Sequence, residues 1–345
     1  MAKKGKDVSI EMMLKATSLA RGKSESNETF LARVTHLHLQ SKRILNVSKV
    51  DVCTNLKVLY LYDNMIDDIP SLEFAKKLAY LYLQNNNIHH MPELVIPNLK
   101  KIYLDENKID FLTGLQNCAL LEELFIARQR LPRYTPLEFD IASLQAVADT
   151  LQVIDVSGNQ IESILPLQTL YNLRRVLAQD NNISNVGDIE AVVSLSKIEE
   201  ANFINNPCCH RPRYRDCAVA AASDRLKLLD DVEVLKHQQI AIRGLQAHRR
   251  KIGAMFPEPI DNGYYNEEDD AVGMDGVGGS IFGEDVDGEA IQVQYSEADD
   301  VAFGARPEGD TNLYSDAPPG GTGDGGLDGG AAVEIPVVGT VDAVQ

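Results

Sequence analysis

The side chains that could carry catalysis or hold a metal form no specific pattern in this chain. The most suggestive set is Cys208, Cys209, His210 and Cys217, whose spacing C-C-H-x6-C matches no zinc-site pattern of real specificity. Adjacent cysteines are also poorly placed to share one tetrahedron, so small buried residues in a cap are favoured over a metal site. The chain contains no P-loop, no G-x-S-x-G and no H-E-x-x-H. We therefore expect no enzyme, no metal and no cofactor.

Aromatic residues, by contrast, recur beside regularly spaced leucines, and this favours a protein-binding face. The candidate partner-binding residues are His36, His38, Tyr60, Tyr62, Tyr80, Tyr82, Tyr103, Asp105, Phe125, Asp155 and Arg175. An exposed aromatic patch on a soluble protein usually marks an interface, and tyrosine is enriched among the residues that dominate binding energy. The alternative is a self-packed aromatic ladder that only favours strand pairing. We expect two neighbouring columns of rings, one of Tyr60, Tyr80, Tyr103 and Phe125 and the other of Tyr62 and Tyr82.

A repeat must position these residues. The pattern L-x-x-L-x-L-x-x-N-x-I begins at Val34, Leu56, Leu78, Leu99, Leu121, Leu151, Leu173 and Ile198. Five of its seven steps lie within one residue of 22, which chance would not produce. The L-x-L alternation predicts a short strand with its leucines inward, and the Asn amide is expected to bond backbone groups of neighbouring coils. Because no single coil can bury its apolar face, we predict a solenoid with a parallel sheet on its concave side.

Two units depart from the asparagine rule, with Lys42 in the first unit and Gln129 in the fifth. The first unit lies at an edge, and the fifth is eight residues longer than its neighbours, so its turn is expected to be remodelled. The expansion, residues 133–148, contains the apolar residues Leu137, Phe139, Ile141, Leu144 and Val147. We expect these to pack as a helical turn on their own unit, and a second docking surface is the alternative.

The sequence divides into four segments. Residues 1–30 are expected to form an N-terminal capping helix, with Ile10, Met13 and Leu14 at helical spacing, and a linker. Residues 31–206 hold the eight repeats, and residues 207–256 a C-terminal cap and a basic helix. Tyr214, Leu226 and Leu229 are expected to cover the last coil, followed by a helix from about Val232 to Ile252. Residues 257–345 are Gly/Asp-rich and acidic, and we expect them to be disordered.

Charge and cysteine content limit the partners and the compartment. The formal net charge is −18, but residues 257–345 hold 21 acidic residues against one basic residue, which leaves residues 1–256 with 30 acidic and 32 basic residues. A nearly neutral body argues against nucleic-acid binding. Five cysteines without a signal peptide favour reduced thiols, and no apolar run reaches the ~18 residues of a membrane span. We expect no membrane and a cytosolic, nuclear or cytoskeletal location.

The stretch between Gln238 and Lys251 is similar to a degenerate IQ motif. Gln239, Arg243 and Gly244 lie at the expected positions, but Gln238 replaces the leading aliphatic residue. An amphipathic basic helix can dock a calmodulin-like partner. Packing on the cap with a solvated basic face is the favoured interpretation.

The 22-residue step and the terminal cap resemble the SDS22-like class of leucine-rich repeats. Three stretches are more specifically similar to the protein phosphatase 1 regulatory subunit 42 (testis leucine-rich-repeat protein) family: V-L-Y-L-Y-D-N-M-I from Val58, L-A-Y-L-Y-L-Q-N-N-N-I from Leu78, and Q-R-L-P-x4-L-E-F-D-x2-S-L-x3-A-D-T-L from Gln129. The resemblance covers residues 9–235. It implies a non-catalytic regulatory or scaffold subunit associated with the phosphatase, with microtubule motors, and with centrosomes, basal bodies and flagella.

Two functions from different classes follow. The chain is either a regulatory subunit that binds the protein phosphatase 1 catalytic subunit, or a structural adaptor of cilia or centrosomes with no phosphatase role. The chain has no R-V-x-F-type docking motif, so any phosphatase contact must use the folded surface.

Overall fold

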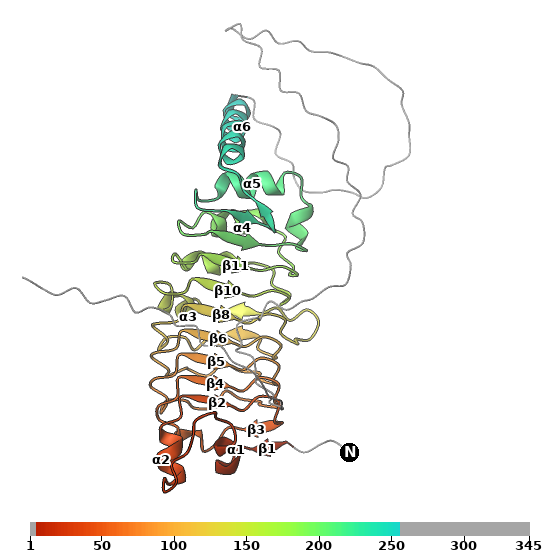
Figure 1. The fold of residues 1–345 in the computed structure, drawn as a ribbon. Coiled ribbons are helices and arrows are strands. Elements are labelled where there is room, and N and C mark those ends of the chain that lie inside the picture. The colour runs from red at the N-terminus through yellow and green to blue at the C-terminus, as the bar shows by residue number, and fades with distance from the viewer. Residues whose placement is uncertain (1–4, 256–345) are drawn as a thin grey trace, which may run out of the picture. The chain divides into compact units, whose positions relative to one another are not determined.

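The computed structural model describes residues 5–255, which form a stack of coils with one long sheet along one side (Figure 1). Within these residues the main sheet has ten strands in the order β14-β13-β12-β11-β10-β8-β6-β5-β4-β2, and all its neighbours are parallel except β13 and β14. The strands are β2 (His36–His38), β4 (Val58–Tyr60), β5 (Tyr80–Tyr82), β6 (Lys101–Tyr103), β8 (Glu123–Phe125), β10 (Val153–Asp155), β11 (Arg175–Leu177), β12 (Glu200–Asn202), β13 (Leu228–Leu229) and β14 (Val232–Glu233). The predicted solenoid with a parallel sheet is confirmed.

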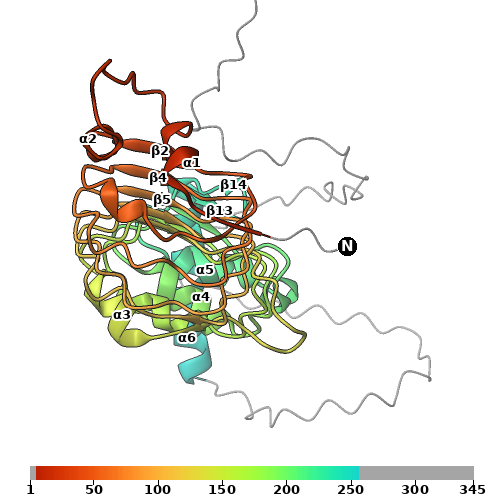
Figure 2. The same ribbon diagram turned by 90° about the horizontal axis from the view of Figure 1, so that it is seen from below.

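Apart from the 20-residue helix α6, the remaining elements are short and close the other sides and the ends of the stack (Figures 1 and 2). Two small parallel sheets pair β1 (Lys6–Asp7) with β3 (Ile44–Asn46) and β7 (Phe111–Leu112) with β9 (Glu138–Phe139). The α-helices are α1 (Ile10–Leu14), α2 (Asn27–Ala32), α3 (Ile141–Ala146), α4 (Val186–Val193), α5 (Tyr214–Ala221) and α6 (Lys236–Met255), and the 3-10 helices are η1 (Val50–Val52), η2 (Leu165–Thr169) and η3 (Pro207–His210).

The inward leucines set the register of the main sheet. Leu59 pairs with Leu81, and Leu81 pairs with Ile102, so the same repeat position meets itself on each neighbouring strand. All three side chains are fully buried in one continuous core. A slip of one residue would turn every leucine outward, which fixes the pairing.

A side-chain amide joins each coil to the one before it. Asn86 accepts a hydrogen bond from Ile66 N at 3.1 Å, and its amide donates to Leu61 O at 3.0 Å and to Leu83 O at 2.9 Å. These bonds link a backbone N–H and a carbonyl of the preceding coil with a carbonyl of its own coil. The same arrangement recurs down the stack, and we call it the amide ladder: Asn64, Asn86, Asn107, Gln129, Asn159, Asn181 and Asn206.

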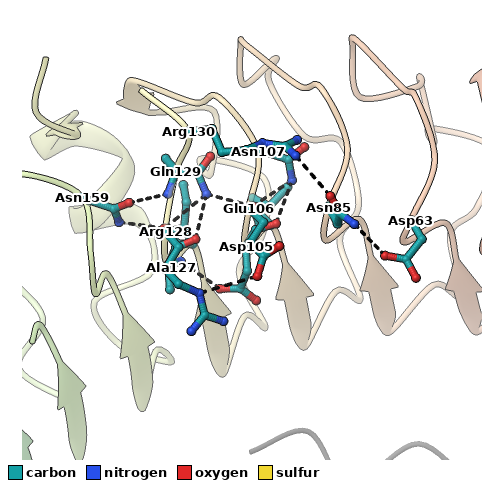
Figure 3. Close-up of polar contacts among 12 residues, drawn as sticks. Asp63, Asn85, Asp105, Glu106, Asn107, Ala127, Arg128, Gln129, Arg130 and Asn159 are labelled. Carbon is teal, nitrogen blue, oxygen red and sulfur yellow. Dashed lines mark hydrogen bonds and ion pairs between the residues drawn. The ribbon is translucent and has the colours of Figure 1, made fainter. Parts of the chain in front are cut away.

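The side chain of Gln129 takes the place of an asparagine in this ladder, whereas the backbone of the turn that follows it is remodelled, as expected (Figure 3). Asn159 Oδ1 accepts from Gln129 N at 2.7 Å, and Leu131 N donates to Gln129 O at 2.8 Å, where a regular coil would bond the amide of the residue two positions after the asparagine to the next ladder side chain. The Gln129 side chain accepts from Ile109 N at 3.0 Å and donates to Leu104 O at 2.9 Å, as an asparagine does elsewhere. The next guanidinium, Arg130, reaches back across two coils and donates to Asn85 Oδ1 at 3.2 Å. The other exception, Lys42, contributes only its backbone N–H, which donates to Asn64 Oδ1 at 3.0 Å.

The expansion packs on its own unit, as expected, through α3 and β9. Leu137, Leu144 and Val147 are buried, whereas Phe139 is only half-buried. Ile141 was expected to pack inward, but it is 51% exposed because it opens α3 on the solvent side of that helix. Asp140 caps α3 by accepting from Ala142 N and Ser143 N.

Both ends of the stack are covered. At the start, α1 begins after the cap Ser9 and buries Met13, while Ile10 remains exposed, and α2 spans the boundary drawn at residue 30. Tyr214, Leu226 and Leu229 are buried over the last coil, as predicted.

The helix expected from Val232 starts four residues later. Val232–Glu233 form β14 instead, in a hairpin with β13. Asp230 and Asp231 at its turn have φ of 52° and 60°, the left-handed pair that a tight hairpin turn requires. The disorder predicted for residues 257–345 lies outside the described residues.

Truncating an inward leucine tests the register. Leu81→Ala should lower the free energy of unfolding by about 2–5 kcal/mol, because it removes a fully buried side chain and leaves a cavity. Leu120→Ala, at a leucine that is 44% exposed, is the control and should cost less than about 1 kcal/mol. Urea denaturation of both variants measures the difference, and equal losses would mean that the register is wrong.

Removing an amide tests the ladder. Gln129→Ala leaves Ile109 N, Leu104 O and Ile126 O without their buried partner, so we expect a loss of about 2 kcal/mol or more. Gln160→Ala is the matched control, since this glutamine bonds the more exposed loop groups Pro132 O and Tyr134 N. Denaturation curves that move equally for both glutamines would contradict a special role for the ladder.

Candidate protein-binding face

The side chains of the main sheet that point away from the core form what we call the sheet face. Its most regular feature is a stacked column of rings at one repeat position: His38, Tyr60, Tyr82, Tyr103 and Phe125. Successive ring centroids are 4.6, 4.8, 4.6 and 4.6 Å apart, with interplanar angles of 9°, 20°, 6° and 2°. In-register parallel strands place equivalent side chains at the strand spacing, which suits face-to-face contact.

The expected columns were therefore wrong in register. Tyr60 pairs with Tyr82, and Tyr82 with Tyr103, whereas Tyr80 pairs with Val58 and Lys101 in a flanking column. That flanking column starts at the exposed His36 and runs through Tyr80 to Arg175 and Glu200. The correct register could have been predicted from the sequence, because Tyr60 and Tyr82 each follow the first leucine of L-x-L whereas Tyr80 precedes it.

Tyr62 lies one column further along. Ser41 N donates to Tyr62 O, and Asp63 N donates to Gln84 O, so the ladder of backbone bonds continues past the strands. Tyr62 therefore lines up with Gln84 and not with Tyr82.

The stacked column is less exposed than an open aromatic patch. Tyr60 is only 9% exposed, and the other rings of the column are half-buried. Burial raises the pKa of Tyr60, and it lowers the pKa of His38, with His36 and Lys42 adding to the second shift. The rings cover one another's faces, so the column presents mainly ring edges to a partner.

Charged residues of the sheet face pair with the neighbouring strand. Lys101 lies 2.9 Å from Glu123, and Lys100 lies 2.8 Å from Glu122. Further along, the Arg175 guanidinium is 2.8 Å from Glu200. Such exposed pairs add little stability, but they fix the positions of charges that a partner would meet.

Two carboxylates lie deeper in the floor of this face. Asp105 is 2% exposed and accepts from Ala127 N at 2.8 Å (Figure 3). Asp155 follows Phe125 in the register of the stacked column and accepts from Ser157 N at 3.0 Å and Ser157 Oγ at 2.5 Å. Burial raises the pKa of the Asp155 carboxyl, against the opposing effect of the Ser157 bonds and of Arg128 and Arg175.

The IQ-like residues of α6 hold that helix to α5. Gln239 is buried and donates to Val219 O at 3.3 Å and Ala222 O at 3.2 Å, and Arg243 donates to Ala220 O at 3.1 Å and pairs with Asp224 at 2.6 Å. Gln239 and Arg243, on which the IQ-like similarity depends, thus donate hydrogen bonds to carbonyl groups near the end of α5. This supports packing on the cap.

The cysteine cluster does not assemble as a metal site in the part of the chain that the structure describes. Cys208 is buried, but Cys209 and Cys217 are half-buried and His210 is exposed, so only the first fits the expected small buried residue. The hydrogen bond with Cys208 lowers the pKa of the Cys209 thiol. Of the helices between residues 5 and 255, none is both long and apolar enough to cross a bilayer.

Comparison with known proteins finds partial similarities. No protein-family model matches the chain. Among curated proteins, it is similar to the probable U2 small nuclear ribonucleoprotein A′ of Caenorhabditis elegans, with 29% identity over 104 residues that make up 29% of this chain and 41% of that protein. The chain thus spans about two fifths of that relative's length.

Among solved structures, the chain is similar to internalin C2 of Listeria monocytogenes str. 4b F2365. The TM-score is 0.48 at 18% identity, covering 66% of this chain and 92% of the other. The repeated L-x-x-L-x-L unit, the parallel sheet and the amide ladder decide the class. The chain folds as a leucine-rich-repeat solenoid. Leucine-rich-repeat proteins serve as protein-interaction scaffolds, which agrees with a binding role for the sheet face.

Neutralising Asp155 tests whether the charge of this carboxylate on the sheet face lowers the stability of the fold. Burial raises the pKa of Asp155 in the folded state above its value in the unfolded chain. The free energy of unfolding therefore falls as pH rises from the unfolded-state pKa through the folded-state pKa, because the carboxyl must then ionise in a buried position. Asp155→Asn keeps an acceptor for Ser157, so the variant should be more stable than the parent at pH 7. The gap should close as pH falls toward the ordinary Asp pKa of about 3.9.

The opposite behaviour is expected at Asp140. The Ser143 hydroxyl bond lowers the pKa of this capping carboxylate, so its contribution is present at neutral pH and lost as pH falls. Asp140→Asn should therefore lose stability at pH 7. Urea midpoints from pH 4 to pH 7 check both signs, and a destabilised Asp155→Asn at pH 7 would show that the carboxylate is structural.

Proposed function

We propose that this leucine-rich-repeat protein is a non-catalytic regulatory or scaffold subunit that binds the protein phosphatase 1 catalytic subunit through its sheet face. The observation that carries the binding role is the stacked column with its flanking ion pairs, a preformed surface across consecutive coils. A preordered surface loses little side-chain entropy on association.

The choice of phosphatase is supported by the resemblance of three stretches to the regulatory subunit 42 family. The longest of these, residues 129–151, is built into the stack through Gln129 and α3. The chain has no exact R-V-x-F sequence, and the related run K-I-D-F from Lys108 to Phe111 has Ile109 fully buried in the core, so the contact would have to be made by the folded face.

The alternative is a structural adaptor of the axoneme or basal body that binds microtubule motors or axonemal proteins and has no phosphatase role. The lack of an exact R-V-x-F sequence favours it. Both functions place the protein in the cytoplasm and cytoskeleton, at the centrosome, basal body, cilium or flagellum. A calmodulin-like protein at α6 would compete with the bonds of Gln239 and Arg243 to α5.

Recognition of RNA is less well supported by this surface, although the Caenorhabditis elegans relative is named as a ribonucleoprotein. Lys100, Lys101 and Arg175 each pair with a glutamate on the neighbouring strand. Their charge is therefore largely neutralised where a phosphate backbone would need it.

Direct binding to the purified protein phosphatase 1 catalytic subunit tests the proposal. The variant is Tyr62→Ala with Tyr80→Ala, two half-buried rings outside the stacked column. Tyr60 is avoided because it is buried between His38 and Tyr82, so its truncation would disturb the stack itself. If either tyrosine is a hot spot of about 2 kcal/mol, the affinity falls roughly thirtyfold.

The control is Tyr171→Ala, a tyrosine that is 51% exposed and lies off the sheet face. It should leave the affinity within about twofold of that of the parent. All variants should keep the far-UV circular dichroism spectrum of the parent, which reports their helix and sheet content. No binding by the parent chain would reject the phosphatase and leave the adaptor function. Equal affinities for the parent and the double variant would reject the sheet face.

A further inference from the structure

Asp155 stands out among the charges of the sheet face by its hydrogen bonding. Ser157 N and Ser157 Oγ both donate to the same oxygen, Oδ1. Among the described residues, none donates a hydrogen bond to Oδ2. The residue ends β10, where Ile154 points into the core and Asp155 points away from it, half-buried.

The neighbours on both adjacent strands are apolar. Asp155 pairs with Phe125 on β8 and with Leu177 on β11, so the carboxylate lies between an aromatic and an aliphatic side chain. Such surroundings remove water from a carboxylate, and they strengthen any charge-assisted bond that it forms. The raised pKa of this group agrees with that loss of water.

The cations around Asp155 already have acidic partners. Arg128, after β8, pairs with Glu106 at 3.6 Å, and Arg175 on β11 pairs with Glu200 at 2.8 Å. On the strands before it, Lys101 pairs with Glu123 at 2.9 Å. Arg128 and Arg175 also act on Asp155 itself, but with Asp105 and Asp155 included three cations lie among five carboxylates, so this part of the face is negatively charged.

We propose that Asp155 is the anchor for a basic side chain, lysine or arginine, presented by the protein that binds the sheet face. The inference rests on the proposed binding role of this face, but not on the identity of the partner. An incoming cation would pair with Oδ2 and offset part of this negative charge. Its aliphatic stem, or the plane of a guanidinium, would contact the face of Phe125 that is turned away from Tyr103.

A randomised peptide library displayed on phage is the probe, selected against the full chain. Enriched peptides are synthesised, and their dissociation constants are measured by fluorescence polarisation with the parent, Asp155→Asn and Glu200→Gln. The last variant is the matched control, because it also neutralises an acid of the sheet face but one already paired with Arg175. Each peptide is also tested with its basic residue replaced by norleucine.

We expect the enriched peptides to share a lysine or arginine. Asp155→Asn should weaken them at least tenfold and Glu200→Gln less than about threefold. The norleucine peptide should bind the parent as weakly as the original peptide binds Asp155→Asn, with no further loss when both changes are combined. Thermal melting of Asp155→Asn should show a folded variant, so that weaker binding is not unfolding.

Enriched peptides without a basic residue, or with equal affinity for the parent and Asp155→Asn, would overturn the assignment. A selection that yields no binder would overturn it too. If basic peptides bind through Asp155 while the phosphatase catalytic subunit does not bind, the phosphatase proposal fails and the anchor stands.

Discussion

Each coil of this protein turns inward after its three-residue strand, and the turn leaves backbone N–H and carbonyl groups where water cannot reach them. The amide ladder satisfies these groups, with one side chain bonding two coils at once, as Asn86 does through Ile66 N, Leu61 O and Leu83 O. An unpaired buried group costs about 1–3 kcal/mol, so every coil after the first needs its amide. Because each amide reaches the preceding coil, the ladder also fixes the offset between coils.

The sheet face inherits its order from that constraint. Coils held at a constant offset place the same repeat position on neighbouring strands, which brings Tyr60 onto Tyr82 and Lys101 onto Glu123. The stacking and the ion pairs are therefore consequences of the ladder and the inward leucines. As a result, most charged groups of the face already have a partner on the neighbouring strand. Asp155 differs, because no described residue donates a hydrogen bond to its Oδ2.

The period of the leucines was enough to predict the solenoid and its sheet, because burial of one apolar residue at each repeated position dictates the stacking. The role of Gln129 in the ladder was not predicted. Its side chain is one methylene longer than that of asparagine, and only the structure shows that its amide bonds the same three backbone groups. The columns of rings were misassigned, although the position of Tyr82 inside L-x-L carried the answer. Burial of Tyr60 and the use of Gln239 and Arg243 to hold α6 depend on contacts between distant segments, which no local pattern records.

Hydrogen exchange of the free chain tests most directly whether the amide ladder holds the stack together. The amides of Ile66, Ile88 and Ile109 donate to Asn86, Asn107 and Gln129. They should exchange as slowly as the strand-bonded amides of Leu61 and Leu83, and only through unfolding of the stack. Exchange of these three amides at rates typical of exposed loops, while Leu61 and Leu83 stay protected, would contradict the account.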